Sequence, residues 1–125
     1  MLIDTDVLIW YMRGNANAYQ VVTNQPEFAL SVVTYMEIVQ GMRNKHEYDE
    51  LQKALKSWNA RILPVNEAIS EKARVYVEQY FLSHALELAD AFIAATAVMH
   101  SLPILTGNDK HYKMIAELTI RKFMP

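Results

Sequence analysis

The residues of this chain that could do chemistry are acidic side chains, scattered along the sequence among apolar neighbours. Asp4 and Asp6 lie in the opening run MLIDTDVLI, and Asp90 lies in ELADAFIAATAVM. A carboxylate is almost never buried without a partner, and no Lys or Arg lies within one helical turn of Asp90. Three more residues with oxygen ligands belong to this set: Glu37, Asn108 and Asp109.

Such residues, brought together, would form a site for a hard divalent cation. Several carboxylates within a few ångströms repel one another strongly in a low dielectric, and a cation stabilises that arrangement. Ligands that are all oxygen favour Mg²⁺ or Mn²⁺ over zinc. Phosphodiester hydrolysis is the natural chemistry of such a site, because the ion can activate water, orient the phosphate and stabilise the leaving oxygen.

Each of these residues also has a purely structural alternative. Asp6 could cap a helix or complement the dipole of its first turn, and Asp90 could do the same. Glu37 follows Thr34 at the spacing of a capping box. The turn sequence GND would be expected to contain Asn and Asp in any case. The metal-site interpretation therefore depends on the whole set and not on one residue.

The composition is that of one globular domain, which we expect to span residues 1–125. With 12 Lys and Arg against 14 Asp and Glu, the net charge of −2 gives no global attraction to nucleic acid or to an anionic membrane. The absence of cysteine excludes disulfides and thiolate metal sites, and it fits a cytoplasmic protein. The longest apolar run, Ala91 to Met99, is shorter than the roughly 20 residues that a membrane helix needs.

The elements that would position these residues alternate between strand and helix. Apolar runs predict strands over 1–5, 28–30, 61–65, 103–106 and 118–123. Helical periodicity and caps predict helices over 6–11, 16–23, 31 to 41 or 44, 46–58, 66–80 and 87–100, with a short helix in GNDKHYKMI. Ser31 and Asn66 are the candidate N-caps of the third and fifth of these helices. The helix over 87–100 is apolar all round and should be buried.

This alternation predicts an α/β fold with a mainly parallel sheet and helices on both of its faces. In such folds ligands bind beyond the carboxyl ends of the strands, where the strand order reverses. The acidic residues follow predicted strands or lie near helix starts. We therefore expect them to converge in one acidic pocket.

Four segments together resemble the PIN-domain ribonucleases, and within them the VapC-type toxins of bacterial and archaeal toxin–antitoxin pairs. The segments are LIDTDVLI, ALSVVTYMEIVQGM, LADAFIAATA and ILTGNDKHY. Their order, their spacing and their near-full-length coverage make the match specific. The resemblance implies a three-layer α/β/α fold with a five-stranded parallel sheet in the order 3-2-1-4-5.

The resemblance also implies which residues form the site. Asp4, Glu37 and Asp90 match the first three acidic positions of the family, whereas Asn108 stands where relatives often have a carboxylate. The side chains that could complete the site are Asn108, Asp109 and Asp6. The predicted catalytic residues are Asp4, Glu37, Asp90 and Asn108, and the predicted metal ligands are Asp4, Glu37, Asp90, Asp6 and Asp109.

The implied activity is that of a Mg²⁺- or Mn²⁺-dependent endoribonuclease. The resemblance implies a homodimer, inhibited by a VapB-type antitoxin whose C-terminal segment occupies the active-site groove, with operator DNA bound only through the antitoxin. Because the overall charge is weak, RNA would need local basic contacts. His111 is a further candidate to reach a phosphate, and the candidate RNA contacts are Arg13, Arg43, Lys45, Lys110 and Lys113.

Two other functions remain open at this stage. The DxD sequence after an apolar strand also resembles the haloacid-dehalogenase phosphatases, with Asp4 as nucleophile and Asp6 as acid and base. That alternative leaves Glu37 and Asp90 without a role, and it conflicts with Leu8, where those enzymes have a small or hydroxyl residue. The second alternative is a catalytically degenerate domain that only binds a partner protein, motivated by the amide of Asn108 and the net negative charge.

Overall fold

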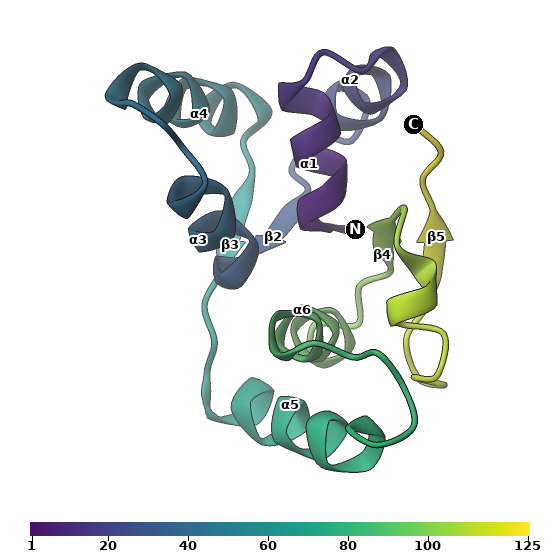
Figure 1. The fold of residues 1–125 in the computed structure, drawn as a ribbon. Coiled ribbons are helices and arrows are strands. Elements are labelled where there is room, and N and C mark those ends of the chain that lie inside the picture. Colours follow the sequence, from purple (N-terminus) through teal and green to yellow (C-terminus); the bar gives the residue numbers. More distant parts are fainter.

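A computed structural model describes all 125 residues and contains one five-stranded parallel sheet (Figure 1). The strand order is β3-β2-β1-β4-β5, and every neighbouring pair is parallel. The predicted order is therefore confirmed, and the order reverses between β1 and β4. The strands are β1 (Leu2–Ile3), β2 (Ala29–Ser31), β3 (Arg61–Leu63), β4 (Ile104–Thr106) and β5 (Ile120–Lys122).

Six α-helices and one short 3-10 helix connect the strands. They are α1 (Thr5–Met12), α2 (Ala16–Thr23), α3 (Val32–Gln40), α4 (Lys45–Trp58), α5 (Glu67–Tyr80), α6 (Leu88–Met99) and η1 (Asp109–His111). Four strands, β1, β3, β4 and β5, are shorter than predicted, and β1 is short because α1 begins at Thr5. None of the helices combines the length and the apolar character needed to cross a bilayer.

Side chains of the short strands alternate between two hydrophobic cores, one on each face of the sheet. Leu2 of β1 and Ile104 of β4 pack in a core with α5 and α6. Their neighbours Ile3 and Leu105 pack in a second core with residues of α1, α2, α3 and α4. This period of two is the geometry of a strand. Figure 1 shows α5 and α6 on one side of the strands, and α1, α2 and α4 on the other, which confirms the predicted layers.

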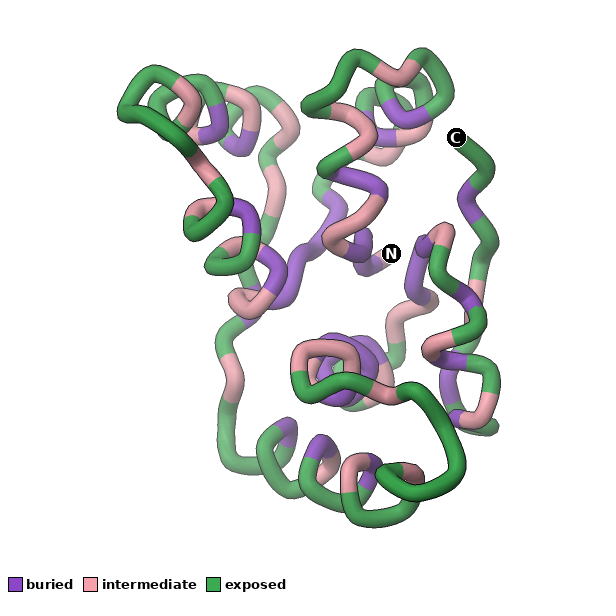
Figure 2. The backbone as a smooth tube through the Cα atoms, in the orientation of Figure 1, coloured by how far each residue is buried: buried purple, intermediate pink, exposed green.

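Helix α6 is the buried helix that its apolar sequence predicts. It lies between the sheet and α5, and its middle is buried in Figure 2. Its two ends are more open, because Leu88 is 66% exposed and Met99 is 45% exposed. The fully buried residues of its middle are mostly small: Ala91, Ile93, Ala94, Ala95, Thr96 and Ala97. Small side chains let α6 approach both the sheet and α5 closely.

Polar caps fix the starts of several helices at the ends of the strands. Ser31 is the last residue of β2, and its hydroxyl caps α3 as predicted. Gly41 ends that helix, whereas Asn44 caps the start of α4. Asn66 caps α5, also as predicted. These caps satisfy backbone N–H groups that would otherwise lack partners, and they hold the helix starts next to the carboxyl ends of the strands.

Candidate metal centre

Asp4 is the central acidic residue of the site and is only 4% exposed. It follows β1 directly, at the reversal of the strand order. Its Oδ1 accepts the backbone N–H of Thr5 at 2.8 Å. Its Oδ2 accepts the hydroxyls of Thr106 at 2.8 Å and of Tyr112 at 3.1 Å. Burial, and secondarily the negative charge of Asp6, raises the pKa of Asp4 to about 6.

Thr5 connects the start of α1 to Glu37 on α3. Its hydroxyl lies 2.8 Å from Glu37 Oε1 and 3.0 Å from the hydroxyl oxygen of Thr34. Glu37 is exposed, and it contacts the residue that directly follows Asp4. The capping-box alternative for Glu37 requires Thr34 to cap α3, but that cap is Ser31. Glu37 therefore faces the acidic site instead of its own helix start.

Asp6 lies in the first turn of α1 and reaches the loop after β4. Its Oδ2 accepts the backbone N–H of Gly107 at 2.8 Å. Its Oδ1 is buried and has no hydrogen-bond partner. Burial raises the pKa of Asp6. The helix-start position foreseen as an alternative is thus observed, but the unpartnered oxygen shows that the helix does not satisfy the whole carboxylate.

Asp90 lies in the first turn of α6 with 15% of its side chain exposed. Its Oδ2 accepts the backbone N–H of Glu87 at 3.2 Å, in a reciprocal capping box, and lies 3.1 Å from His111 Nδ1. Its Oδ1 lies 3.4 Å from the hydroxyl of Tyr112. Burial raises the pKa of Asp90. Asp90 therefore caps its helix, as the structural alternative states, and also faces Asp4 across the Tyr112 hydroxyl.

The fourth acidic position of the sequence pattern differs from the first three. Asn108 is exposed, and its backbone N–H donates to the hydroxyl of Thr106. Asp109 is turned toward β5, where its Oδ1 lies 3.0 Å from Lys122 Nζ and its Oδ2 lies 3.2 Å from Lys113 Nζ. These two ammonium groups hold the pKa of Asp109 below its usual range. Both oxygens of Asp109 are thus engaged with lysines.

The donor set at the end of β1 fits a divalent cation. In this conformation no three His, Asp or Glu side chains lie close enough together to enclose an ion. However, no Lys or Arg pairs with Asp4, Asp6, Glu37 or Asp90. Burial raises the pKa values of Asp4, Asp6 and Asp90, because their ionised forms are poorly solvated and a nearby cation would stabilise them. Oxygen ligands with unbalanced negative charge are what Mg²⁺ and Mn²⁺ bind.

Three hydroxyl residues that organise this centre are not singled out by the sequence analysis: Thr5, Thr106 and Tyr112. Thr5 stands between two aspartates and Thr106 lies three residues before Asp109, so their proximity to acidic residues in the sequence is a usable signal. Tyr112 carries no such signal, because a tyrosine near a predicted helix is more often a core residue. Burial and the neighbouring carboxylates raise the pKa of Tyr112 well above that of ordinary tyrosine, so its hydroxyl keeps its proton.

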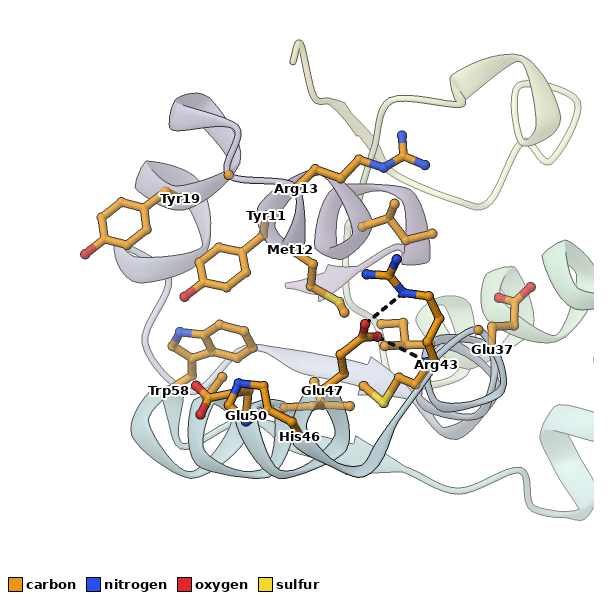
Figure 3. Close-up of a pocket in the computed structure, with 17 residues that line it drawn as sticks. Tyr11, Met12, Arg13, Tyr19, Glu37, Arg43, His46, Glu47, Glu50 and Trp58 are labelled. Carbon is orange, nitrogen blue, oxygen red and sulfur yellow. Dashed lines mark hydrogen bonds and ion pairs between the residues drawn. The ribbon is translucent and has the colours of Figure 1, made fainter.

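A groove of about 910 Å³ lies between α1, α2, α3 and α4, and Glu37 is the one predicted acidic-site residue that lines it (Figure 3). Glu37 lies at one end, and Tyr11, Tyr19 and Trp58 lie at the other. The rings of Tyr11 and Tyr19 are stacked with centroids 6.0 Å apart, and Trp58 meets Tyr11 edge-on at 5.0 Å. The groove is thus lined by aromatic rings at one end and by a carboxylate at the other.

The predicted basic residues are distributed around these features. Arg13 and Arg43 line the groove, and Arg43 Nε lies 3.0 Å from Glu47 Oε1. Lys113 is held in the ion pair with the carboxylate of η1 described above. The remaining two are exposed and have no ion pair: Lys45 and Lys110.

Comparison with known proteins agrees with the fold and with the resemblance seen in the sequence. A family model described as the PIN domain matches residues 1–118. Ribonuclease VapC10 of Mycobacterium tuberculosis is 34% identical over 122 residues, which cover 94% of this chain and 90% of that protein. The match therefore spans almost the full length of both sequences.

Two solved structures have the same arrangement of helices and strands. A chain of a toxin–antitoxin complex from Klebsiella pneumoniae superposes with a TM-score of 0.79 at 30% identity, covering 94% of both chains. A chain of VapBC2 from Rickettsia felis, solved with a DNA fragment from its promoter, superposes with a TM-score of 0.79 at 17% identity and 98% coverage of both chains. With the family model matched over residues 1–118, the chain belongs to the PIN-domain family.

Proposed function

We propose that this protein is a VapC-type toxin, an endoribonuclease that hydrolyses RNA phosphodiester bonds with the help of Mg²⁺ or Mn²⁺. The observation that carries the proposal is a pair of carboxylates without a cationic partner, the buried Asp4 and the half-buried Asp6 with its buried Oδ1, beside Asp90 at the reversal of the sheet. The 34% identity to a ribonuclease supports RNA as the substrate.

In this proposal Asp4, Glu37 and Asp90 hold the cation. Asp6 is the best candidate to complete the site, because its buried Oδ1 has no partner. Asn108 is also available since it is exposed, whereas both oxygens of Asp109 are engaged with lysines. The chemistry that the bound cation supplies is activation of water and neutralisation of the charge that develops on the phosphate.

The chain's own residues have separate tasks in the reaction. Thr5 and Thr106 orient Asp4 through the hydrogen bonds to its two oxygens. Thr5 also holds Glu37 through its Oε1, which orients this carboxylate and leaves its Oε2 available for the cation. The apolar packing of α6 holds Asp90 at the start of that helix. Exposed basic side chains, Lys45 and Lys110 among them, are candidates to contact the RNA backbone.

The groove between α1, α2, α3 and α4 fits the predicted protein partner. We propose that the C-terminal segment of a VapB-type antitoxin lies along its aromatic residues and reaches toward Glu37, so that it blocks access to the acidic centre. Operator DNA would be bound through the antitoxin, because this chain has a net charge of −2. We further propose that the toxin is a homodimer, as the resemblance implies.

The phosphatase alternative gains no support from the site. A nucleophilic aspartate must be reached by the substrate phosphate, but Asp4 is only 4% exposed. The alternative of a degenerate, purely protein-binding domain is decided by experiment.

Mapping RNA ends in bacteria after brief expression tests the proposed function. The comparison sets the wild type beside Asp90→Asn, with Asp49→Asn as a control at an exposed carboxylate of α4. We expect new RNA ends and growth arrest with the wild type and with Asp49→Asn, and neither with Asp90→Asn. Identical end maps for all three folded proteins would reject the nuclease and leave the protein-binding alternative.

A further inference from the structure

We propose that Tyr112 is a positioning residue that holds the carboxylates of Asp4 and Asp90 facing each other for the cation. The inference rests on the proposed function and adds a residue to its machinery. Tyr112 is the one side chain whose hydroxyl lies within hydrogen-bond distance of both aspartates, 3.1 Å from Asp4 Oδ2 and 3.4 Å from Asp90 Oδ1, so that its single proton is shared between them.

The ring of Tyr112 is fixed, so its hydroxyl is fixed as well. The residue is 0% exposed and belongs to the core formed with α5 and α6. It follows η1 directly, and its backbone N–H donates to the carbonyl of Asp109. Asp109 is in turn tied to β5 by Lys122. The hydroxyl is therefore presented by a packed ring on an anchored turn, and not by a mobile side chain.

The position of this hydroxyl offsets the repulsion between the buried carboxylate of Asp4 and the half-buried carboxylate of Asp90. Ionised carboxylates only accept hydrogen bonds, whereas a phenol can donate one. Without the hydroxyl, Asp4 and Asp90 would face each other with no donor between them, and like charges in a poorly solvated site disfavour that arrangement. A carboxylate free to turn away would no longer present its oxygen to an ion.

The hydrogen bonds also select which oxygen of Asp4 is available. Oδ2 accepts from both Thr106 and Tyr112, whereas Oδ1 accepts only from the backbone of Thr5. A carboxylate oxygen has about two lone-pair sites, so Oδ2 is saturated and Oδ1 keeps a free site. Removal of the Tyr112 hydroxyl would free a lone-pair site on Oδ2, so that either oxygen of Asp4 could bind the ion.

Asp90 also depends on Tyr112 for the position of one of its oxygens. Its Oδ2 is held by Glu87 and His111, but its Oδ1 meets only the hydroxyl of Tyr112. His111 thus fixes Asp90 to η1 without reaching Asp4. Tyr112 is the residue that couples the start of α6 to the end of β1.

Tyr112→Phe tests this inference because it removes the hydroxyl and keeps the ring. The matched control is Tyr76→Phe, which removes the hydroxyl of another buried tyrosine, one that donates to Glu117 on the α5 side of the molecule. The primary readout is the dissociation constant of Mn²⁺, measured by electron paramagnetic resonance on protein without RNA. Cleavage kinetics and urea unfolding in EDTA are measured on the same proteins.

We expect Tyr112→Phe to bind Mn²⁺ about 10- to 100-fold more weakly, the usual effect of losing a group that orients a metal ligand. Cleavage at low Mn²⁺ should fall, higher Mn²⁺ should restore it, and KM for RNA should stay near the wild-type value. Tyr76→Phe should keep wild-type Mn²⁺ affinity even if its stability falls. Wild-type Mn²⁺ affinity in Tyr112→Phe would overturn the inference while leaving the nuclease intact. A wild-type protein that neither binds Mn²⁺ nor cleaves RNA would reject the proposed function as well.

Discussion

Asp6 accepts the backbone N–H of Gly107 at 2.8 Å, and this bond ties the first turn of α1 to the loop after β4. The approach is close because residue 107 has no side chain. A Cβ atom at this position would lie 2.7 Å from Asp6 Oδ2. The glycine of the TGN sequence is therefore required by the neighbouring carboxylate, and its backbone does not have a positive φ.

Gly107→Ala should displace the Asp6 carboxylate and break its hydrogen bond to the loop. Because Asp6 is partly buried, we expect the free energy of unfolding to fall by about 1 to 3 kcal/mol. Urea unfolding measures this change. Gly41→Ala is the control, because its Cβ would meet the nearest atom at an ordinary 3.6 Å. In an Asp6→Ala background the cost of Gly107→Ala should largely disappear, and an unchanged cost there would show that Asp6 is not the cause.

Asp4→Asn should stabilise the protein in EDTA at neutral pH while it abolishes activity. The folded pKa of Asp4 is about 6 against an ordinary value of 3.8, so the folded state binds the proton more tightly than the unfolded state does. Stability due to this group is therefore present below about pH 4 and lost as pH rises through 6, by about 3 kcal/mol in all.

Urea unfolding at pH 4.5 and 7.5 measures the effect of Asp4→Asn. The asparagine variant should exceed the wild type at pH 7.5, and the difference should shrink toward pH 4.5. Asp49→Asn, at an exposed carboxylate, should follow the wild type at both values. A parallel loss of stability in the wild type and in Asp4→Asn would contradict the assigned pKa.

Asp109→Asn should distinguish a structural role of Asp109, in ion pairs with lysines, from a role as a metal ligand. Its oxygens pair with Lys113 and Lys122, so the substitution should weaken the attachment of η1 to β5 and lower the urea midpoint. Mn²⁺ affinity, measured by isothermal titration calorimetry, should remain near that of the wild type. A loss of Mn²⁺ binding as large as that of Asp90→Asn would instead make Asp109 a metal ligand.

Tyr19→Ser should weaken antitoxin binding without slowing RNA cleavage. Tyr19 is 58% exposed, stacks on Tyr11 and lies at the end of the groove away from Glu37. Loss of an aromatic anchor at an interface costs on the order of 2 kcal/mol, or roughly 30-fold in affinity. Calorimetry with the antitoxin, which we expect to be encoded immediately upstream, measures this. Tyr48→Ser, on α4 outside the groove, is the control. An equal loss of antitoxin affinity in both variants would show that the antitoxin does not bind in this groove.

Those parts of the fold could be predicted that depend on local sequence, namely apolar periodicity and residues that cap helices. Alternating strands and helices gave the parallel sheet, the apolar run around Ala94 predicted a buried helix, and Ser31 and Asn66 predicted helix caps. The strand order came from the resemblance to a family, since no local pattern encodes which strands are neighbours. Asn44 shows the limit of such patterns: the same residue type could end one helix or begin the next, and it begins α4.

The contacts within the site were less accessible from the sequence. The lysine that pairs with Asp109 at 3.0 Å is Lys122, and only the pairing of β4 with β5 brings the two together. Tyr112 reaches Asp4 across 108 positions of the chain, and nothing in its local sequence distinguishes it from a core aromatic. The types of the acidic residues predict the chemistry, but the hydroxyls that orient them are fixed by tertiary packing.

Cleavage of RNA by the purified protein, titrated with Mn²⁺ after removal of metal by EDTA, tests the central claim most directly. We expect cleavage to require Mn²⁺ in the wild type and in Asp49→Asn, and to be lost in Asp4→Asn, Glu37→Gln and Asp90→Asn. Cleavage that persists in EDTA, or that survives in Asp4→Asn and Asp90→Asn at wild-type rates, would contradict a metal centre built on these carboxylates.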